Sequence, residues 1–168
     1  MCIAVVGRHY TVKQSRGSVF PGDKSAFQVR IADWRHDRDV LATIRRRVFI
    51  QEQNVPEDLE WDEHDDHALH FLVMGADGKV IGCARLLPDG HFGRMAVLAD
   101  WRNQGAGRAL LQAALTEAQT RGHDVIRLSA QSHAAGFYLR HGFVIVGDDY
   151  MEAGIAHVAM QKKLAADH

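Results

Sequence analysis

The sequence predicts a mixed α+β domain built on a central twisted sheet, and three observations lead to this fold class. Apolar and polar residues alternate in short segments, as is typical of β-strands, and glycine- and aspartate-containing turns separate them. Other segments repeat apolar residues at helical spacing. The order strand, helix, three strands, helix, strand, helix, two strands indicates an antiparallel first half and a later strand–helix–strand crossover. We therefore expect a mixed sheet of about six or seven strands with helices on both faces.

The chain length fits one domain, because 168 residues correspond to about one unit of typical size. The content of 46% hydrophobic and 24% charged residues is ordinary for a soluble globular protein. Residues 1–26 mix glycine, serine, lysine and arginine without periodicity. We expect them to form a poorly packed N-terminal extension, followed by a single domain over residues 27–168.

A cytoplasmic location is expected. No window approaches the ~18 apolar residues of a membrane span, so no membrane partner is predicted. The apolar run near the N-terminus is short and no basic region precedes it, unlike a secretory signal. Cys2 and Cys83 lie far apart and in no metal-binding or redox spacing, which favours reduced thiols.

The domain is expected to begin with a strand and a helix. Residues from Phe27 alternate apolar and polar side chains as a strand does. Asp33 or Asp37 can then cap a helix, which ends at Pro56 at the latest. The apolar residues that recur at helical spacing are Val40, Leu41, Ile44 and Val48.

The rest of the domain alternates short strands and helices. Asp77-Gly78 predicts a tight turn of a β-hairpin, and Asp148-Asp149 predicts an acidic turn between the last two strands. A long helix is expected to end at Gly122, because glycine favours the conformation that follows a helix C-terminus. The expected strands are residues 68–75, 80–87, 91–98, 125–130, 143–147 and 155–164, and the helices lie within 102–122 and 132–142.

Charge is distributed unevenly, although 20 basic and 21 acidic residues nearly cancel. Residues 48–78 contain no lysine or arginine, and residues 52–66 hold eight carboxylates. Residues 79–108 carry five basic and two acidic residues. Neighbouring sites for a cation and an anion would explain this pattern, and so would a solvated acidic loop. No aromatic residues are interleaved with basic ones, so no nucleic-acid partner is expected.

The most informative motif is a glycine turn between a strand and a helix, at residues 102–108. Gly105 and Gly107 allow the backbone to approach a ligand closely, and the first helical N–H groups then form an anion site. Arg102 and Arg108 add positive charge, so a phosphate is the natural ligand. The P-loop signature is absent, and so are the third glycine and the acidic residue of the dinucleotide fingerprint.

In these residues the sequence resembles the GCN5-related N-acetyltransferases (GNAT). The family hallmark, Arg/Gln-x-x-Gly-x-Gly/Ala, is matched at residues 102–107, directly after a strand. A Phe-Tyr pair at 137–138 and a Gly-Phe pair at 142–143 are similar to the second signature of the family. The resemblance covers Phe27 to about Leu164 and implies the acyl-CoA N-acyltransferase fold.

The resemblance implies an acetyl-CoA site. Backbone amides of the glycine turn would hold the pyrophosphate, and the preceding strand edge would pair with the pantetheine arm and direct an N–H at the thioester carbonyl. The helix with the Phe-Tyr pair would lie on the other side of the arm. The implied binding residues are Met95, Ala96, Val97, Arg102, Gln104, Gly105, Ala106, Gly107, Arg108, Phe137 and Tyr138.

Amine acetylation requires a proton donor for the leaving thiolate and a proton acceptor for the amine. Tyr138 fits the donor, because a phenol with a pKa near ~10 stays protonated at neutral pH, although it could also be an ordinary packing aromatic. His91 is a candidate base, because an imidazole titrates near neutral pH, but it could simply face water after its turn. Glu52 and Asp65 are rival bases acting through water, and a water chain without a single owner is a further alternative.

A metal site is not expected, although His64, His67 and His70 recur every three residues. A strand is predicted to begin near Ala68, so no single helix presents all three side chains on one face.

The function expected from these observations is acetyl transfer from acetyl-CoA, as co-substrate, to a primary amine by direct attack in a ternary complex. The acceptor can be a small molecule, a polyamine or a peptide or protein amine, and loops at residues 50–66 and 147–155 would set the choice. The alternative is a non-catalytic module that senses acetyl-CoA. A homodimer is left open.

Overall fold

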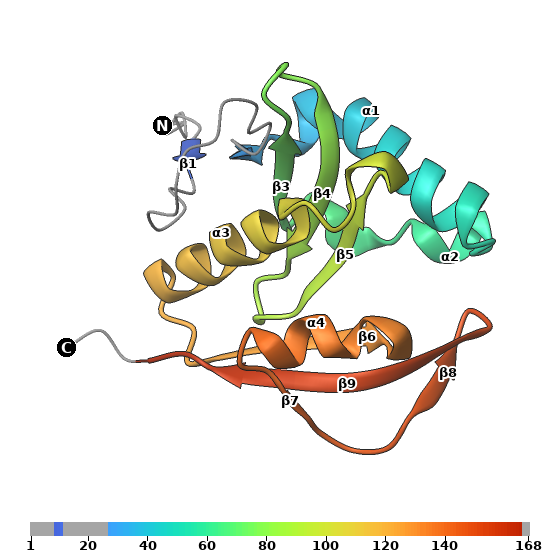
Figure 1. The fold of residues 1–168 in the computed structure, drawn as a ribbon, viewed down its shortest axis with the longest axis vertical. Helices are drawn as coiled ribbons and strands as arrows, with labels where there is room; N and C mark the ends of the chain where they lie inside the picture. The colour runs from blue at the N-terminus through green and yellow to red at the C-terminus, as the bar shows by residue number, and fades with distance from the viewer. Residues whose placement is uncertain (1–8, 12–26, 166–168) are drawn as a thin grey trace.

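The computed structural model describes residues 9–11 and 27–165, and its first sheet has five strands in the order β1-β2-β3-β4-β5 (Figure 1). Each neighbouring pair is antiparallel, which confirms the predicted meander. The strands are β1 (His9–Thr11), β2 (Gln28–Ala32), β3 (Leu69–Met74), β4 (Val80–Leu86) and β5 (Phe92–Val97).

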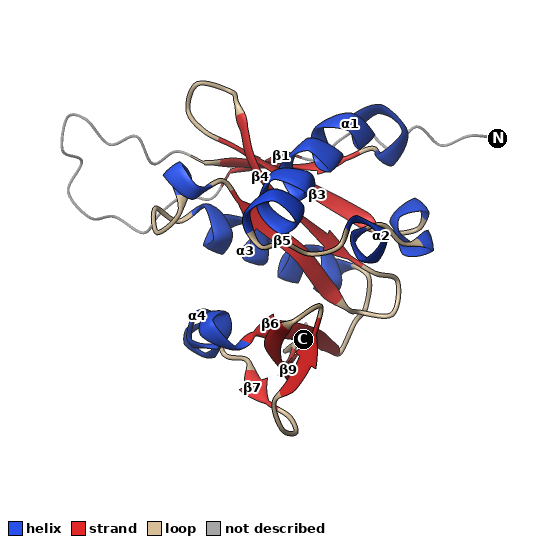
Figure 2. Ribbon diagram, turned by 90° about the vertical axis from the view of Figure 1, so that its right-hand side faces the viewer, coloured by secondary structure: helices blue, strands red, loops and turns tan. Residues whose placement is uncertain are grey.

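The second sheet contains the C-terminal strands in the order β6-β9-β7, with β8 also paired to β9. All of these pairs are antiparallel. The strands are β6 (Val125–Gln131), β7 (Val144–Ile145), β8 (Tyr150–Glu152) and β9 (Ile155–Lys163). Figures 1 and 2 show this sheet and α4 (Ala135–Arg140) set apart from the first sheet.

The mixed α+β fold class is confirmed, but the strands do not form one continuous mixed sheet. Within the described residues, the parallel pairing of β5 with β6 is reduced to one bridge, between His91 and Arg127. Beyond it, β5 bends away: its register with β4 shifts between Cys83 and Arg85, and Arg94 has a φ of 47°. A β-bulge bends and twists a strand in this way, so the bulge at Arg94 separates the two sheets.

Helices cover both faces of the first sheet, as expected. The helix α1 (Trp34–Arg45) is capped by Asp33, whose carboxylate accepts hydrogen bonds from the N–H groups of Arg35 and His36. It packs through Leu41 and Ile44 against one face, and α3 (Ala106–Thr120) packs against the other. Because β3 is covered on both sides, it reads as a nearly continuous apolar run. The long helix α3 is followed by Gly122 with a φ of 78°, which confirms the predicted end.

The acidic segment is folded rather than an extended loop. After α1 the chain continues as a π-helical segment, η1 (Arg46–Glu52), and then forms α2 (Glu57–Glu60) and the 3₁₀ turn η2 (Glu63–Asp66). Two further 3₁₀ turns, η3 (Ala99–Trp101) and η4 (Ser132–Ala134), precede α3 and α4. The short strand β8 lies where only a turn was predicted.

Three sequence-based expectations concern the N-terminal extension, the cysteines and membrane spans. Within residues 1–26, His9–Thr11 forms β1 and pairs with β2, and the rest of that segment lies outside the described residues. Cys2 lies outside them too. Cys83 is a buried free thiol, and burial raises its pKa to about 12. Of the described helices, none is both long and apolar enough to cross a membrane.

Candidate active site

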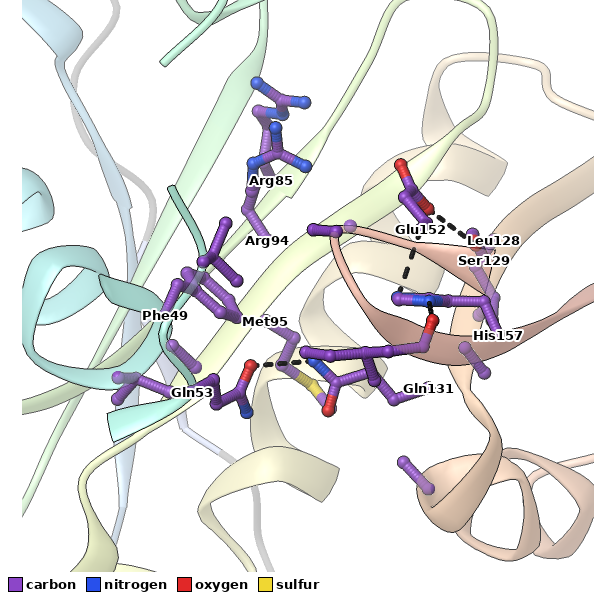
Figure 3. Close-up of a pocket in the computed structure, with 18 of the residues that line it drawn as sticks. Phe49, Gln53, Arg85, Arg94, Met95, Leu128, Ser129, Gln131, Glu152 and His157 are labelled. Carbon is purple, nitrogen blue, oxygen red and sulfur yellow. Dashed lines mark hydrogen bonds and ion pairs between the residues drawn. The ribbon is translucent and has the colours of Figure 1, made fainter. Parts of the chain in front are cut away.

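A cleft of about 620 Å³ opens where β5 and β6 diverge from the bridge between His91 and Arg127 (Figure 3). Its walls come from both sheets, from η1 and α2, and from the β8–β9 turn. Segments 50–66 and 147–155, expected to border the acceptor, therefore both contribute to the walls. Polar residues lining it are Gln53, Glu60, Arg85, His91, Arg94, Arg102, Ser129, Gln131, His133, Tyr138, Glu152 and His157.

The edge of β5 forms one wall of the cleft. Among the described strands, β5 has β4 on one side and only the single bridge to β6 on the other. Met95, Ala96 and Val97 all line the cleft at this edge. The Val97 carbonyl accepts a hydrogen bond from Arg102 Nε at 2.9 Å, so it is directed away from the β4 ladder. A sheet edge of this kind can pair with an extended ligand.

The glycine turn opens α3 next to this edge. Gly105 is the N-cap residue, with a φ of 101° that disfavours any residue with a side chain. Having no side chain, it leaves the first-turn amides without a side-chain cap. A Cβ built on Gly107 would lie 3.8 Å from both Met95 Cε and Phe137 Cζ. The start of α3 therefore packs against Met95 of β5 and Phe137 of α4, whereas of residues 102–108 only Arg102 lines the cleft.

The remaining residues of the turn differ in their exposure. Gln104 and Arg108 are exposed, and the Gln104 side chain donates a hydrogen bond to the Asp100 carbonyl at 2.9 Å. Ala106 is buried in the core. Arg108 therefore presents its charge at the outer end of the turn, where it can meet the phosphates of a ligand.

Tyr138 lines the cleft from α4 and is otherwise buried. Its ring packs edge-on against Phe137 and Phe143, with centroids 5.0 and 5.7 Å away. Burial raises the pKa of the Tyr138 hydroxyl well above its ordinary value. The phenol therefore remains a proton donor throughout the neutral range.

The structure does not leave Glu52 available as a base. Its carboxylate receives hydrogen bonds from Arg102 Nη1 and Nη2, at 2.5 and 2.9 Å. This guanidinium holds the pKa of the Glu52 carboxyl below its ordinary value. The pair instead links the end of η1 to the turn between η3 and α3.

Asp65 is not available either, because it is buried beneath the acidic segment and does not line the cleft. Its Oδ1 accepts hydrogen bonds from Arg45 and Arg85, at 2.7 and 2.9 Å. Glu60 pairs with Arg45 at 2.6 Å, and Asp62 pairs with Arg85 at 2.7 Å.

This buried network changes the interpretation of the acidic segment. Five of its eight carboxylates pair with arginines: three pair with arginines from α1, β4 and β5, the last being Arg94, whose Nη2 lies 3.2 Å from Asp62, and Glu52 and Glu57 pair with Arg102 and Arg46. These charges cancel one another, so they stabilise the fold rather than attract a cation. The three histidines are not gathered either: His70 is buried and its Nε2 donates to the Asp65 carbonyl at 2.8 Å. No group of three metal-ligating side chains occurs in the described part of the chain.

His91 lines the cleft near its narrow end, where β5 and β6 meet. Its Nδ1 lies 3.0 Å from Asp89 Oδ2, and 52% of its side chain is exposed. The sequence analysis missed another histidine, His157 on β9, which lines the wide end of the cleft. It also missed Glu152, whose Oε2 is 4.0 Å from His157 Nε2 (Figure 3). Because side chains alternate between the two faces of a strand, the sequence could have placed His157 on the face opposite the buried Val158 and Met160.

Comparison of the chain with known proteins agrees with this arrangement. Residues 29–164 match the family model of the acetyltransferase (GNAT) domain. The chain belongs to the GNAT acetyltransferase family. Among curated relatives, YjcF of Bacillus subtilis, named an N-acetyltransferase, is 33% identical over 123 residues, covering 71% of this chain and 87% of that protein.

Two solved structures are similar to the chain over most of its length. An acyl-CoA N-acyltransferase from Pseudomonas aeruginosa is 30% identical with a TM-score of 0.70, covering 81% of this chain and 97% of that one. ElaA of Escherichia coli is 29% identical with a TM-score of 0.67, covering 76% and 90%. This GNAT protein is an acyltransferase with the acyl-CoA N-acyltransferase fold.

Proposed function

We propose that this GNAT protein is an acetyl-CoA-dependent N-acetyltransferase that acts on a primary amine by direct attack in a ternary complex. The observation that carries the proposal is the continuity of the cleft. Arg102, the β5 edge and Tyr138 line one cavity, and that cavity also reaches Glu152 and His157 at β8 and β9. A donor and an acceptor can therefore meet inside it.

The residues present fit acetyl-CoA, which supplies the thioester that is attacked. Amides at the start of α3 would hold its pyrophosphate, with Arg108 nearby, and the edge at Met95–Val97 would hold its pantetheine arm. Phe137 would pack on the other side of the arm. Tyr138 would donate the proton that the departing sulfur needs.

The test is turnover with a panel of amines. The protein is mixed with acetyl-CoA and, separately, with small primary amines, polyamines and peptides bearing a free amine. Released CoA thiol and the acetylated product are measured together. The proposal expects both in equal amounts with at least one class of amine. Acetyl-CoA binding without product from any class would instead support the alternative of a non-catalytic sensor.

A further inference from the structure

We propose that His157 is the general base that takes the proton from the acceptor amine, and that Glu152 stabilises the imidazolium so formed. This inference rests on the proposed function and deepens it. The evidence for it comes from the contacts of the two side chains and from the charges around the cleft.

The hydrogen bond of His157 to the backbone determines its tautomer. Nδ1 of the ring lies 2.8 Å from the carbonyl oxygen of Ile155. A carbonyl oxygen can only accept, so Nδ1 must carry the proton. In the neutral ring Nε2 is then unprotonated, with a lone pair that can accept a proton. The backbone thus holds His157 in the form that a base requires.

The position of His157 also suits this role. On β9 it pairs with Gln131, which is the last residue of β6. This end of β6 lies beyond the bridge at Arg127, where β5 and β6 have already diverged. Its side chain lines the cleft and is only 12% exposed. Tyr138 lies in α4, which follows β6 and η4 along the chain, and it lines the same cavity. The proposed base and the proposed acid therefore adjoin one space.

His91 does not share this position. It stands at the bridge itself, and Met95 lies four residues farther along β5, roughly 13 Å at the usual rise of a strand. A proton acceptor must lie within hydrogen-bond reach of the amine, directly or through one water. A thioester held at the Met95–Val97 edge would be beyond the reach of His91.

The charges around the cleft favour Glu152 as the partner of the imidazolium. Of the two carboxylates that line the cleft, Glu60 is ion-paired with Arg45. Within the described residues, no arginine or lysine pairs with Glu152. Its Oε2 lies 4.0 Å from His157 Nε2 and 3.4 Å from Ser129 Oγ. A carboxylate this close stabilises a protonated imidazole.

The proposed step conserves protons and electron pairs. An acceptor that arrives as an ammonium ion first loses one proton to solvent. The nitrogen of the neutral amine then forms a bond to the thioester carbon, and one of its two protons passes to His157 Nε2. The carbon–sulfur bond breaks with its electron pair moving to sulfur, which takes the proton of the Tyr138 hydroxyl. Solvent then carries the proton from His157 back to Tyr138, leaving the amide and CoA thiol as products.

The kinetic test compares His157→Gln with His91→Gln. Loss of a general base lowers turnover by ~10²–10⁴-fold. We expect this loss for His157→Gln, with acetyl-CoA affinity by calorimetry unchanged, and partial recovery of His157→Ala by added imidazole. Near wild-type turnover for His157→Gln, or the large loss in His91→Gln instead, would overturn the assignment.

A second measurement needs no turnover. In the wild-type protein without ligands, the ring nitrogen chemical shifts of neutral His157 should show a protonated Nδ1 and an unprotonated Nε2. The opposite tautomer would contradict the inference. If the wild-type protein acetylates no amine at all, the proposed function itself fails, and the base role fails with it. Wild-type turnover that survives His157→Gln overturns the inference alone.

Discussion

Gln131 Nε2 donates a hydrogen bond of 2.7 Å to Gln53 Oε1 across the cleft (Figure 3). Gln131 ends β6 of the second sheet, whereas Gln53 follows η1, which packs against the first sheet. The bond therefore joins the two sides of the cleft at its wide end, opposite the bridge at His91.

This bond should have a measurable coupling energy. A net contribution of about 1 kcal/mol is typical of an intramolecular hydrogen bond. In a double-mutant cycle of Gln53→Ala and Gln131→Ala, we expect a coupling of about that size in the free energy of unfolding, measured with urea. The same cycle with Gln104→Ala in place of Gln53→Ala is the control and should show additivity. Additivity in both cycles would show that the bond contributes nothing.

Gly107→Val should weaken acetyl-CoA binding sharply without unfolding the protein. The first added carbon lies at ordinary contact distance from Met95 and Phe137, so the fold can accommodate it, but the valine adds bulk to the first turn of α3, to which the pyrophosphate is assigned. Calorimetric titration with acetyl-CoA measures the effect, and thermal unfolding checks the fold. Gln119→Val, on the exposed side of the same helix, controls for a β-branched residue in α3. Unchanged affinity in Gly107→Val would contradict the placement of the pyrophosphate.

Tyr138→Phe should lower turnover by ~10²–10⁴-fold while leaving acetyl-CoA affinity nearly unchanged. The pH dependence has a definite sign. The protonated phenol is the active form, and burial raises its pKa, so activity should not fall as pH rises through ~10, the ordinary pKa of tyrosine. A pH–rate profile of the wild type checks this. A loss of rate near pH 10 that is absent from Tyr138→Phe would show an unshifted tyrosine.

Asp65→Asn should destabilise the protein rather than alter catalysis. Removing one partner of a buried ion pair typically costs about 3–5 kcal/mol, and here it leaves Arg45 and Arg85 short of a charge partner. Urea denaturation should show this loss. Asp66→Asn is the matched control, because Asp66 is exposed beside Asp65. This substitution should change the free energy of unfolding by less than about 0.5 kcal/mol. Equal stabilities would mean that the network is not formed.

The same network shows why part of the site could be predicted from sequence and part could not. The glycine turn and Tyr138 belong to continuous motifs, so their neighbourhood follows from local pattern and element order. The sequence analysis considered a cation site and a solvated loop for the acidic segment but not a buried network, because the arginine partners, Arg45 and Arg85, are 15 or more residues away in sequence. Such pairing depends on tertiary packing, which alternation and periodicity do not reveal.

The division into two sheets and the position of His157 were missed for a related reason. A bulge at Arg94 leaves no strong mark in a strand pattern, yet it determines where β5 leaves β6. His157 becomes part of the cleft only through the pairing of β9 with β6. The sequence analysis named His91, Glu52 and Asp65 as candidate bases, beside a water chain, and did not consider His157.

Glu152→Gln should raise the KM for a cationic acceptor, and this rise should shrink as salt is added. Glu152 is the cleft carboxylate without an arginine or lysine partner among the described residues, so its charge is available to an incoming ammonium group. Dissolved salt screens this attraction over roughly 8–10 Å near physiological ionic strength. Glu63→Gln, at an exposed position of η2 that does not line the cleft, is the control and should leave the acceptor KM unchanged. The KM for acetyl-CoA should stay the same in both variants, because its phosphates are assigned to the glycine turn. Steady-state kinetics at two salt concentrations measures all of these constants. An acceptor KM that does not move in Glu152→Gln would exclude recruitment by this carboxylate, and a fall in turnover alone would leave it only the role of stabilising the imidazolium of His157.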